Sequence, residues 1–334
     1  MKVAVIREPK APVAFEDRPV PEAGPGQVRL KVAACGVCHS DYHIWEGFFA
    51  FARLPVVPGH EVAGVVDQVG PGVTGWAIGD RAGVPWIWST CGRCDACVAG
   101  DDPGCPDQVA TGVQVDGGYA PYLVVPAAHA TRIPAGLDLV ETAPLFCAGL
   151  TVYGGLLAAG VQPGMTVAVN GLGGLGHLGV MIASALDTTV IALTRGPEKA
   201  AFAGEIGADH VIDTSAGDPG KALRALGGAD IVLATAPSAQ LMPALLAGLG
   251  NRGTLAIVGA SGESFPVNPS AMLGRRTRIL GSVVGTRTEM RDLLALAVRH
   301  DITPVIERYR LDDVPRVFER MERNAIRYRA VIQF

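Results

Sequence analysis

The chain has 334 residues, of which 49% are hydrophobic and 18% charged, and its formal net charge at pH 7 is −4. This length exceeds what one hydrophobic core usually supports, so we expect two domains with a large buried interior. An acidic chain without a basic stripe lacks the cations that nucleic-acid binding requires, which excludes a nucleic-acid partner.

Residues 1–148 are predicted to form an irregular, mostly β domain. Runs rich in β-branched residues at 28–32, 62–69 and 122–125 alternate with segments rich in proline and glycine. The first ten residues read as a short strand that meets charged residues at once, without the pattern of a secretion signal. We therefore expect a cytoplasmic protein.

Four closely spaced cysteines lie within this first part of the chain. Cys91, Cys94, Cys97 and Cys105 follow the pattern C-x2-C-x2-C-x7-C, which supplies a complete tetrahedral set of sulfur ligands. Such a closed site predicts a structural zinc ion. The alternatives are an iron–sulfur cluster, whose fourth cysteine follows after three residues, and disulfides. The chain contains seven cysteines, an odd number. This favours free thiols in the reducing cytosol over paired disulfides.

The segment from residue 142 to 186 contains no Asp, Glu, Lys or Arg. Pro144, Pro163 and several glycines divide it into pieces too short to span a bilayer. The segment is therefore predicted to hold a buried strand and a buried helix, and no membrane contact is expected.

Strands and helices alternate from residue 166 onward. Strands are predicted at 166–170, 189–194, 210–213, 230–235, 254–258 and 279–284, with helices at 178–186, 197–206 and 240–249. This alternation indicates an α/β fold with a Rossmann doubly wound, parallel, six-stranded sheet in a dinucleotide-binding domain, 149–285. A helix from residue 289, a helix at 314–323 and a strand at 330–333 should rejoin the first domain, which thus comprises 1–148 and 286–334.

A glycine-rich turn follows the first of these strands. Gly171, Gly173 and Gly176 form G-x-G-x-x-G, with Gly174 and Leu175 inside the turn. In the strand–turn–helix context, these glycines let the backbone approach a pyrophosphate at the helix N-terminus. The alternative is a packing turn without a ligand.

The second strand ends in Thr194 and Arg195 instead of an acidic residue. An acid there would accept hydrogen bonds from the adenosine ribose of NAD, whereas its absence and a guanidinium favour a 2′-phosphate. We therefore expect NAD(P) with NADP modestly favoured. Alternatively, Arg195 stacks on adenine or points to solvent, and both cofactors are used.

Longer motifs resemble a known family. The pattern Gly59-His60-Glu61-x2-Gly64-x5-Gly70-x2-Val73, the run from Gly36 to Asp41, the run 145–153 and the glycine-rich turn are similar to those of the zinc-dependent alcohol dehydrogenases. These belong to the medium-chain dehydrogenase/reductase superfamily. The resemblance runs end to end and implies that the mostly β domain is a GroES-like catalytic domain.

The resemblance implies a second zinc site, and therefore two zinc ions per chain. Cys38, His60 and Cys147 would bind a catalytic zinc and leave a fourth position open, as Lewis-acid catalysis requires. Asp41 would orient His60, since a carboxylate fixes the tautomer of a metal-binding imidazole. Glu61 would lie close to the metal.

Further roles come from the resemblance alone. Ser40 and His43 would relay the alcohol proton to solvent, and His39 would face the cofactor pyrophosphate. Cys35 forms C-x2-C with Cys38 and is interpreted as a buried spectator, with a redox pair as the alternative. The residues implied to contact nicotinamide, ribose or phosphate are Thr151, Lys199, Val258, Ser282, Val284 and Arg329. Those implied to line the alcohol pocket are Phe48, Phe49 and Trp86, although these rings could equally be core.

The implied reaction is reversible hydride transfer between a primary or secondary alcohol and NAD(P), with the aldehyde or ketone formed. Aromatic residues in the pocket suggest primary or small aromatic alcohols. One alternative is a cinnamyl-alcohol or formaldehyde-adduct dehydrogenase of the same superfamily. Another is a zinc-stabilised, non-catalytic binding protein on the same fold. The expected assembly is a homotetramer, with a dimer as the alternative.

Overall fold

The computed structural model describes residues 1–236, 238–259 and 262–334. They divide into two compact units. The first unit consists of Met1–Ala148 and Thr286–Phe334, and the second of Gly149–Gly285. Among the described residues no single helix is long and apolar enough to cross a membrane, although the bent pair Leu139–Phe146 and Ala148–Ala158 meets the length and composition criteria together.

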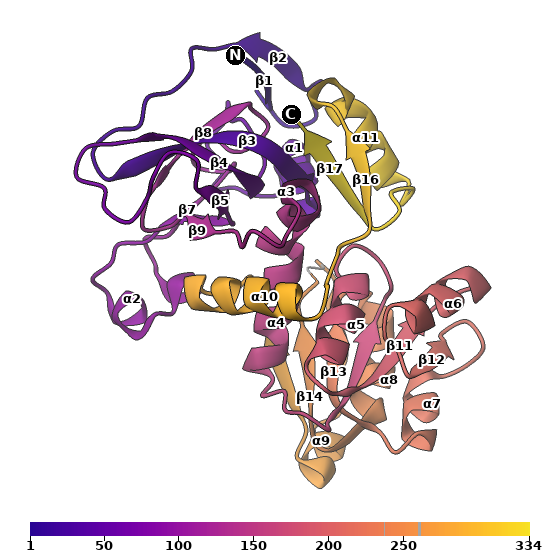
Figure 1. The fold of residues 1–334 in the computed structure, drawn as a ribbon. Helices are drawn as coiled ribbons and strands as arrows, with labels where there is room; N and C mark the ends of the chain where they lie inside the picture. The colour runs from indigo at the N-terminus through magenta and orange to yellow at the C-terminus, as the bar shows by residue number, and fades with distance from the viewer. Residues whose placement is uncertain (237, 260–261) are drawn as a thin grey trace. The chain divides into compact units, whose positions relative to one another are not determined.

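The described residues of the second unit form a parallel, six-stranded sheet (Figure 1). From edge to edge its strands are β12 (His210–Asp213), β11 (Thr189–Thr194), β10 (Thr166–Asn170), β13 (Ala229–Ala234), β14 (Leu249–Ile257) and β15 (Arg278–Gly281). The order runs outward in both directions from the central β10 and β13, so the prediction of a doubly wound Rossmann sheet is confirmed. The central strands are buried on both faces, which their continuous apolar sequences require.

Helices precede or connect these strands. They are α4 (Ala148–Ala158), α5 (Gly176–Ala185), α6 (Pro197–Glu205), α7 (Pro219–Ala225), α8 (Met242–Gly248) and α9 (Pro269–Arg275). The charge-free segment supplies α4, β10 and α5, whose side chains are mostly buried.

The strand β14 is longer than predicted because it begins at Leu249 instead of residue 254. Leu249 is buried and pairs with Ala229, and the pairing then shifts register before Ile231. An irregularity of this kind tolerates the polar residues that follow Leu249. Because those residues interrupt the apolar pattern, the sequence did not predict the first part of the strand.

The first unit contains a seven-stranded mixed sheet. Six of its strands follow the order β16 (Ile306–Tyr309), β17 (Arg329–Gln333), β3 (Gln27–Val37), β4 (Glu61–Val69), β5 (Arg81–Val84) and β9 (Thr131–Arg132), and β8 (Tyr122–Pro126) also pairs with β3. The C-terminal β17 lies antiparallel beside β3, so in Figure 1 a yellow strand lies next to an indigo one. The predicted mostly β fold of this part is thereby confirmed.

Shorter elements complete the first unit. Two small sheets pair β1 (Lys2–Val5) with β2 (Ala14–Asp17) and β6 (Ile87–Ser89) with β7 (Val109–Ala110). The helices are α1 (His39–Glu46), α2 (Asp95–Ala99), α3 (Leu139–Thr142), α10 (Arg287–Arg299) and α11 (Val314–Glu322), with 3-10 turns η1 (Asp102–Gly104), η2 (Ala143–Phe146) and η4 (Leu311–Asp313).

Candidate active site

Strand pairing brings Cys38 and His60 together in the first unit. Gly36 on β3 pairs with Glu61 on β4 in the antiparallel register. Residues just beyond this pair, at the end of β3 and before the start of β4, therefore meet at one edge of the sheet. Cys147 joins them from the end of η2.

These residues form a buried cluster that comprises Cys38, His60, Glu61 and Cys147. Their potential ligand atoms all lie within 4.8 Å of one another. The Sγ atoms of Cys38 and Cys147 are 3.9 Å apart, close to the edge of about 3.8 Å in a zinc tetrahedron with Zn–S bonds near 2.3 Å. Nε2 of His60 is buried and has no hydrogen-bond partner among the described residues. Two thiols and one free imidazole nitrogen at this spacing fit a zinc ion.

Asp41 holds His60 in position. Its fully buried carboxylate lies 3.2 Å from Nδ1 of His60 and accepts hydrogen bonds from the backbone N–H of Cys38 at 2.8 Å and of Gly59 at 3.1 Å. The hydroxyl of Tyr119 donates a further hydrogen bond at 3.1 Å. An ionised carboxylate only accepts, so Nδ1 carries the proton and Nε2 presents a lone pair to the cluster. Sequence reasoning missed Tyr119, for which no local motif exists.

Glu61 is paired with Arg329 at the start of β17. The Arg329 guanidinium donates to one carboxylate oxygen of Glu61 and to the carbonyl of Val37 at 3.2 Å. Burial raises the pKa of the Glu61 carboxyl to about 7, against the lowering effect of Arg329. A Cβ atom on Gly36 would lie 1.9 Å from the other Glu61 oxygen, so only glycine fits there. Arg329, which the sequence predicts at the cofactor, pairs with Glu61 in the structure.

A row of aromatic rings extends from the buried cluster. The Trp86 ring meets His60 edge to face at 4.9 Å between centroids, and Phe49 follows at 5.9 Å from Trp86. Phe48 lies 5.5 Å from Phe49 and is 60% exposed. Phe49 and Trp86 are only partly buried and pack against the core of the unit. Phe49 and Trp86 therefore contribute to packing, and Phe48 forms an exposed apolar end of the row.

The helix α1 carries the residues expected to move protons. The Ser40 hydroxyl lies 3.8 Å from Sγ of Cys38. Nδ1 of His43 lies 2.9 Å from a carboxylate oxygen of Glu46. His39 is exposed at the first residue of the helix. Ser40 thus contacts the buried cluster, whereas His43 is turned toward Glu46.

Cys35 lies outside both potential metal sites. It is fully buried, and burial raises the pKa of its thiol well above the ordinary value. A protonated, buried thiol reacts slowly, which favours the spectator interpretation over a redox pair with Cys38.

The remaining four cysteines form a second cluster, which we call the four-cysteine cluster. The Sγ atoms of Cys91, Cys94, Cys97 and Cys105 lie within 4.8 Å of one another. Those of Cys91 and Cys97 are 3.8 Å apart, again the edge of a zinc tetrahedron. All seven cysteines of the chain are free, so the structure contains no disulfide.

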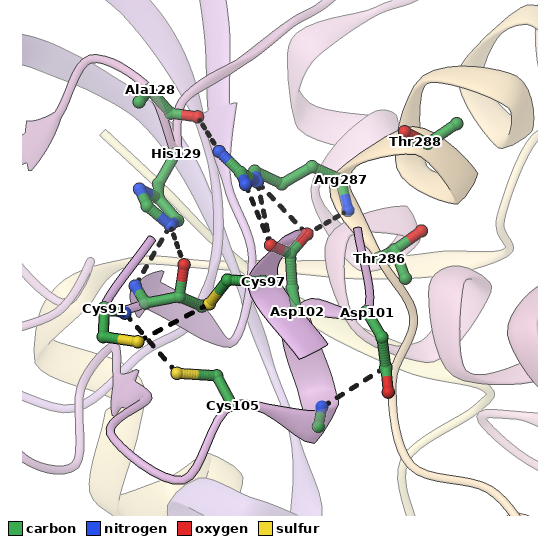
Figure 2. A network of polar contacts seen from close by, with 12 residues as sticks. Cys91, Cys97, Asp101, Asp102, Cys105, Ala128, His129, Thr286, Arg287 and Thr288 are labelled. Atoms are coloured by element: carbon green, nitrogen blue, oxygen red, sulfur yellow. Dashed lines mark hydrogen bonds and ion pairs between the residues drawn. The ribbon is translucent and has the colours of Figure 1, made fainter. Parts of the chain in front are cut away.

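The loop of the four-cysteine cluster is attached to the start of α10 (Figure 2). The carboxylate of Asp102, which is only 2% exposed, accepts from the backbone N–H of Arg287 at 2.8 Å and from its Nε at 3.1 Å. Nη1 of Arg287 in turn donates to the carbonyl of Ala128 at 2.9 Å. Beside it, the backbone N–H of Thr90 donates to Nε2 of His129 at 3.1 Å. Sequence reasoning missed this network, whose members lie far apart in the chain.

Asp102→Asn is expected to loosen this loop. Asparagine keeps one acceptor oxygen but loses the charge that holds Arg287, which should cost about 1–3 kcal/mol locally. We expect faster proteolysis of the loop and faster zinc loss to a chelator. The control is Asp101→Asn, because Asp101 is exposed and its carboxylate accepts within the loop, from Gly104. Equal rates in both variants would contradict the role of Asp102.

In the second unit the glycine-rich turn connects β10 to α5. Gly171 has φ +92°, which favours glycine. A Cβ atom on Gly176 would lie 1.7 Å from the carbonyl oxygen of Gly171, whereas a Cβ on Gly173 would meet nothing within 4 Å. Packing therefore requires Gly176, while the space beside Gly173 is open, as close approach of a pyrophosphate needs.

These two glycines give a matched pair of variants. Gly176→Ala is expected to distort the turn, lower stability by about 1–3 kcal/mol and weaken binding of NADPH. Gly173→Ala should leave the melting temperature unchanged and weaken only NADPH binding. Thermal unfolding and fluorescence titration measure the two effects. A Gly176→Ala variant with unchanged stability would contradict the packing argument.

The other predicted cofactor residues lie on the second unit. Thr194 is buried at the end of β11, and Arg195 and Lys199 are exposed around the start of α6. Val258 follows β14, and Ser282 and Val284 follow β15. The carboxyl ends of parallel strands are where open α/β sheets bind ligands. Thr151 does not lie at a strand end: it is on α4, and it is 8% exposed.

Comparison with known proteins identifies the family of the chain. Residues 24–135 match the family model "Alcohol dehydrogenase GroES-like domain", and residues 174–299 match the model "Zinc-binding dehydrogenase". An alcohol dehydrogenase of Geobacillus stearothermophilus is 38% identical over 335 residues, covering 100% of this chain and 99% of the relative. Cinnamyl alcohol dehydrogenase 8 of Arabidopsis thaliana is 36% identical over 331 residues, covering 96% of this chain and 91% of the relative.

Solved structures of dehydrogenases have the same fold as this chain. An NAD-dependent alcohol dehydrogenase superposes with a TM-score of 0.93 at 30% identity, with both chains fully covered. A dehydrogenase structure from Sinorhizobium meliloti 1021 bound to NADP superposes with a TM-score of 0.89 at 31% identity, covering 100% of this chain and 99% of the other. The chain is thus a zinc-binding dehydrogenase. It belongs to the zinc-dependent alcohol dehydrogenases of the medium-chain dehydrogenase/reductase superfamily, and uses NAD(P). Membership in this family of enzymes argues against the non-catalytic binding protein.

Proposed function

We propose that this enzyme oxidises primary or secondary alcohols, aromatic primary alcohols among them, at a zinc ion held by Cys38, His60 and Cys147. The observation that carries the proposal is the free, buried Nε2 of His60 facing two thiols 3.9 Å apart. Glu61 lies in the same cluster but is engaged by Arg329. Three protein ligands leave a fourth position for the substrate.

When bound, zinc would supply Lewis-acid polarisation of the alcohol oxygen, and the nicotinamide would supply the acceptor for the hydride. The thiolates of Cys38 and Cys147 would hold the metal, and Asp41 would keep His60 in the ligand tautomer. The Ser40 hydroxyl, beside Cys38, receives the alcohol proton. His43 lies on the same helix, α1, next to Glu46, and would release the proton to solvent.

We further propose two zinc ions per chain, because the chain contains two clusters of suitable ligands. The four-cysteine cluster has no position for a substrate and would bind a structural ion. NADP is proposed as the modestly preferred cofactor, because Thr194 offers no acid to the adenosine ribose and Arg195 is exposed beside it.

A homotetramer, with a dimer as the alternative, is proposed for the assembly. The edge strand β15 pairs only with β14 among the described strands. Nearby Leu273 and Val283 are 78% and 65% exposed. An unpaired edge with exposed apolar side chains favours association. The free cysteines favour a reducing compartment, the cytoplasm.

The second candidate is a cinnamyl-alcohol dehydrogenase. The row formed by Trp86, Phe49 and Phe48 favours it, because a planar aryl substrate can stack along such rings. The similarity to the Arabidopsis protein points the same way.

The test is the initial rate of nicotinamide reduction with ethanol, 2-propanol, benzyl alcohol and cinnamyl alcohol, each with NAD and with NADP. We expect turnover with the aromatic primary alcohols to exceed that with ethanol. Higher kcat/KM with NADP would support the interpretation of Thr194 and Arg195. Absence of turnover with all four alcohols, in protein that holds zinc, would contradict the proposed substrate class.

A further inference from the structure

The carboxyl ends of β11 and β12 lie side by side in the six-stranded sheet. Thr194 and Asp213 are partners in the parallel register. The backbone N–H of Thr214 donates to the carbonyl of Thr194 at 2.9 Å, which ties the two strand ends together. Residues 213–215 therefore border the place where β11 ends in Thr194 and Arg195.

The carboxylate of Asp213 is held at this border. Both the hydroxyl of Ser215, at 2.6 Å, and its backbone N–H, at 2.9 Å, donate to the same oxygen. The hydrogen bonds from the Ser215 hydroxyl and backbone lower the pKa of Asp213, and the charge of Arg195 lowers it further. The side chain is exposed and therefore presents a fixed negative charge to the solvent around Arg195.

A fixed carboxylate acts differently on the two cofactors. The 2′-phosphate of NADP carries negative charge, which Arg195 attracts and Asp213 repels. The 2′-hydroxyl of NAD is neutral and is nearly indifferent to both charges. An exposed charge within about one Debye length changes the affinity for an anion by a few-fold.

We propose that Asp213 is a specificity-determining residue that offsets part of the charge of Arg195, so that the preference for NADP stays modest and NAD remains usable. This inference rests on the proposed function, in which the end of β11 meets the adenosine ribose. The acidic residue near the adenosine ribose would then come from the end of β12, because β11 ends without one.

The test is the variant Asp213→Asn, which keeps an acceptor oxygen for Ser215 and removes the charge. Binding of NADPH and NADH is measured by fluorescence titration without any alcohol, so that no turnover is needed. We expect the Kd for NADPH to fall about threefold and that for NADH to change less than about 1.5-fold. The gain for NADPH should shrink at high salt, because exposed charges are screened.

Glu205→Gln is the matched control. Glu205 is exposed at the last residue of α6, about 12 Å along the helix from its first residue, and its replacement removes the same charge. We expect no change in either Kd. Equal effects of Asp213→Asn on NADH and NADPH, no effect, or a gain that salt does not reduce would each overturn the role of Asp213. If the parent protein bound neither cofactor, the proposed dinucleotide site itself would be wrong.

Discussion

Cys147→Ala is expected to lower kcat/KM at least about 1,000-fold and to remove one of the two zinc ions per chain. Its Sγ lies 3.9 Å from that of Cys38 in the buried cluster, and alanine leaves only two strong ligands there. Loss of polarisation by the metal should raise the barrier by about 4 kcal/mol or more. Metal analysis and steady-state kinetics with benzyl alcohol measure both effects.

Cys35→Ala is the matched control for this variant. Cys35 is buried, as Cys147 is, but its thiol belongs to neither metal cluster. We expect it to retain both zinc ions and activity within a few-fold of the parent. The assignment of Cys147 would be refuted if Cys147→Ala kept full activity, or if both variants lost activity and zinc alike.

The second large effect is expected from Asp41→Asn. The Asp41 carboxylate interacts with His60, Tyr119 and two backbone N–H groups, so an amide would place its own donor against other donors. We expect zinc at the buried cluster to bind about 10- to 100-fold more weakly. The free energy of unfolding should fall by about 2–4 kcal/mol. Competition with a chelator and thermal unfolding are the measurements.

Tyr119→Phe tests whether the effect passes through His60. It removes one donor to Asp41 and leaves the contact with His60 in place, so stability should fall by about 1 kcal/mol. Zinc affinity should stay within a few-fold of the parent. If Tyr119→Phe weakened zinc binding as much as Asp41→Asn, orientation of His60 by Asp41 could not be the cause.

Local patterns were sufficient to predict much of the second unit. The strands β10, β11 and β12 have the bounds expected from sequence. The first two are runs of mostly buried apolar residues, and β12 is a short run centred on the β-branched Val211 and Ile212. The four cysteines within one short loop could likewise be recognised as a ligand set, since few other arrangements satisfy four thiols so close together.

Long-range contacts could not be predicted in the same way. Asp102 and Arg287 are 185 residues apart, and Glu61 and Arg329 are 268 apart. Neither pair has a spacing that periodicity or a motif can detect, because strand pairing and tertiary packing bring them together. Family resemblance joined Cys38, His60 and Cys147, and the register of β3 with β4 supplies the physical reason for the first two.

The most direct test of the proposed zinc site follows zinc content and alcohol oxidation together while a chelator withdraws the metal and zinc is then returned. We predict about two zinc ions per chain, complete loss of activity when the buried cluster loses its ion, and recovery on adding zinc. Full activity in protein whose Cys38, His60 and Cys147 hold no metal would contradict a catalytic zinc ion at these residues.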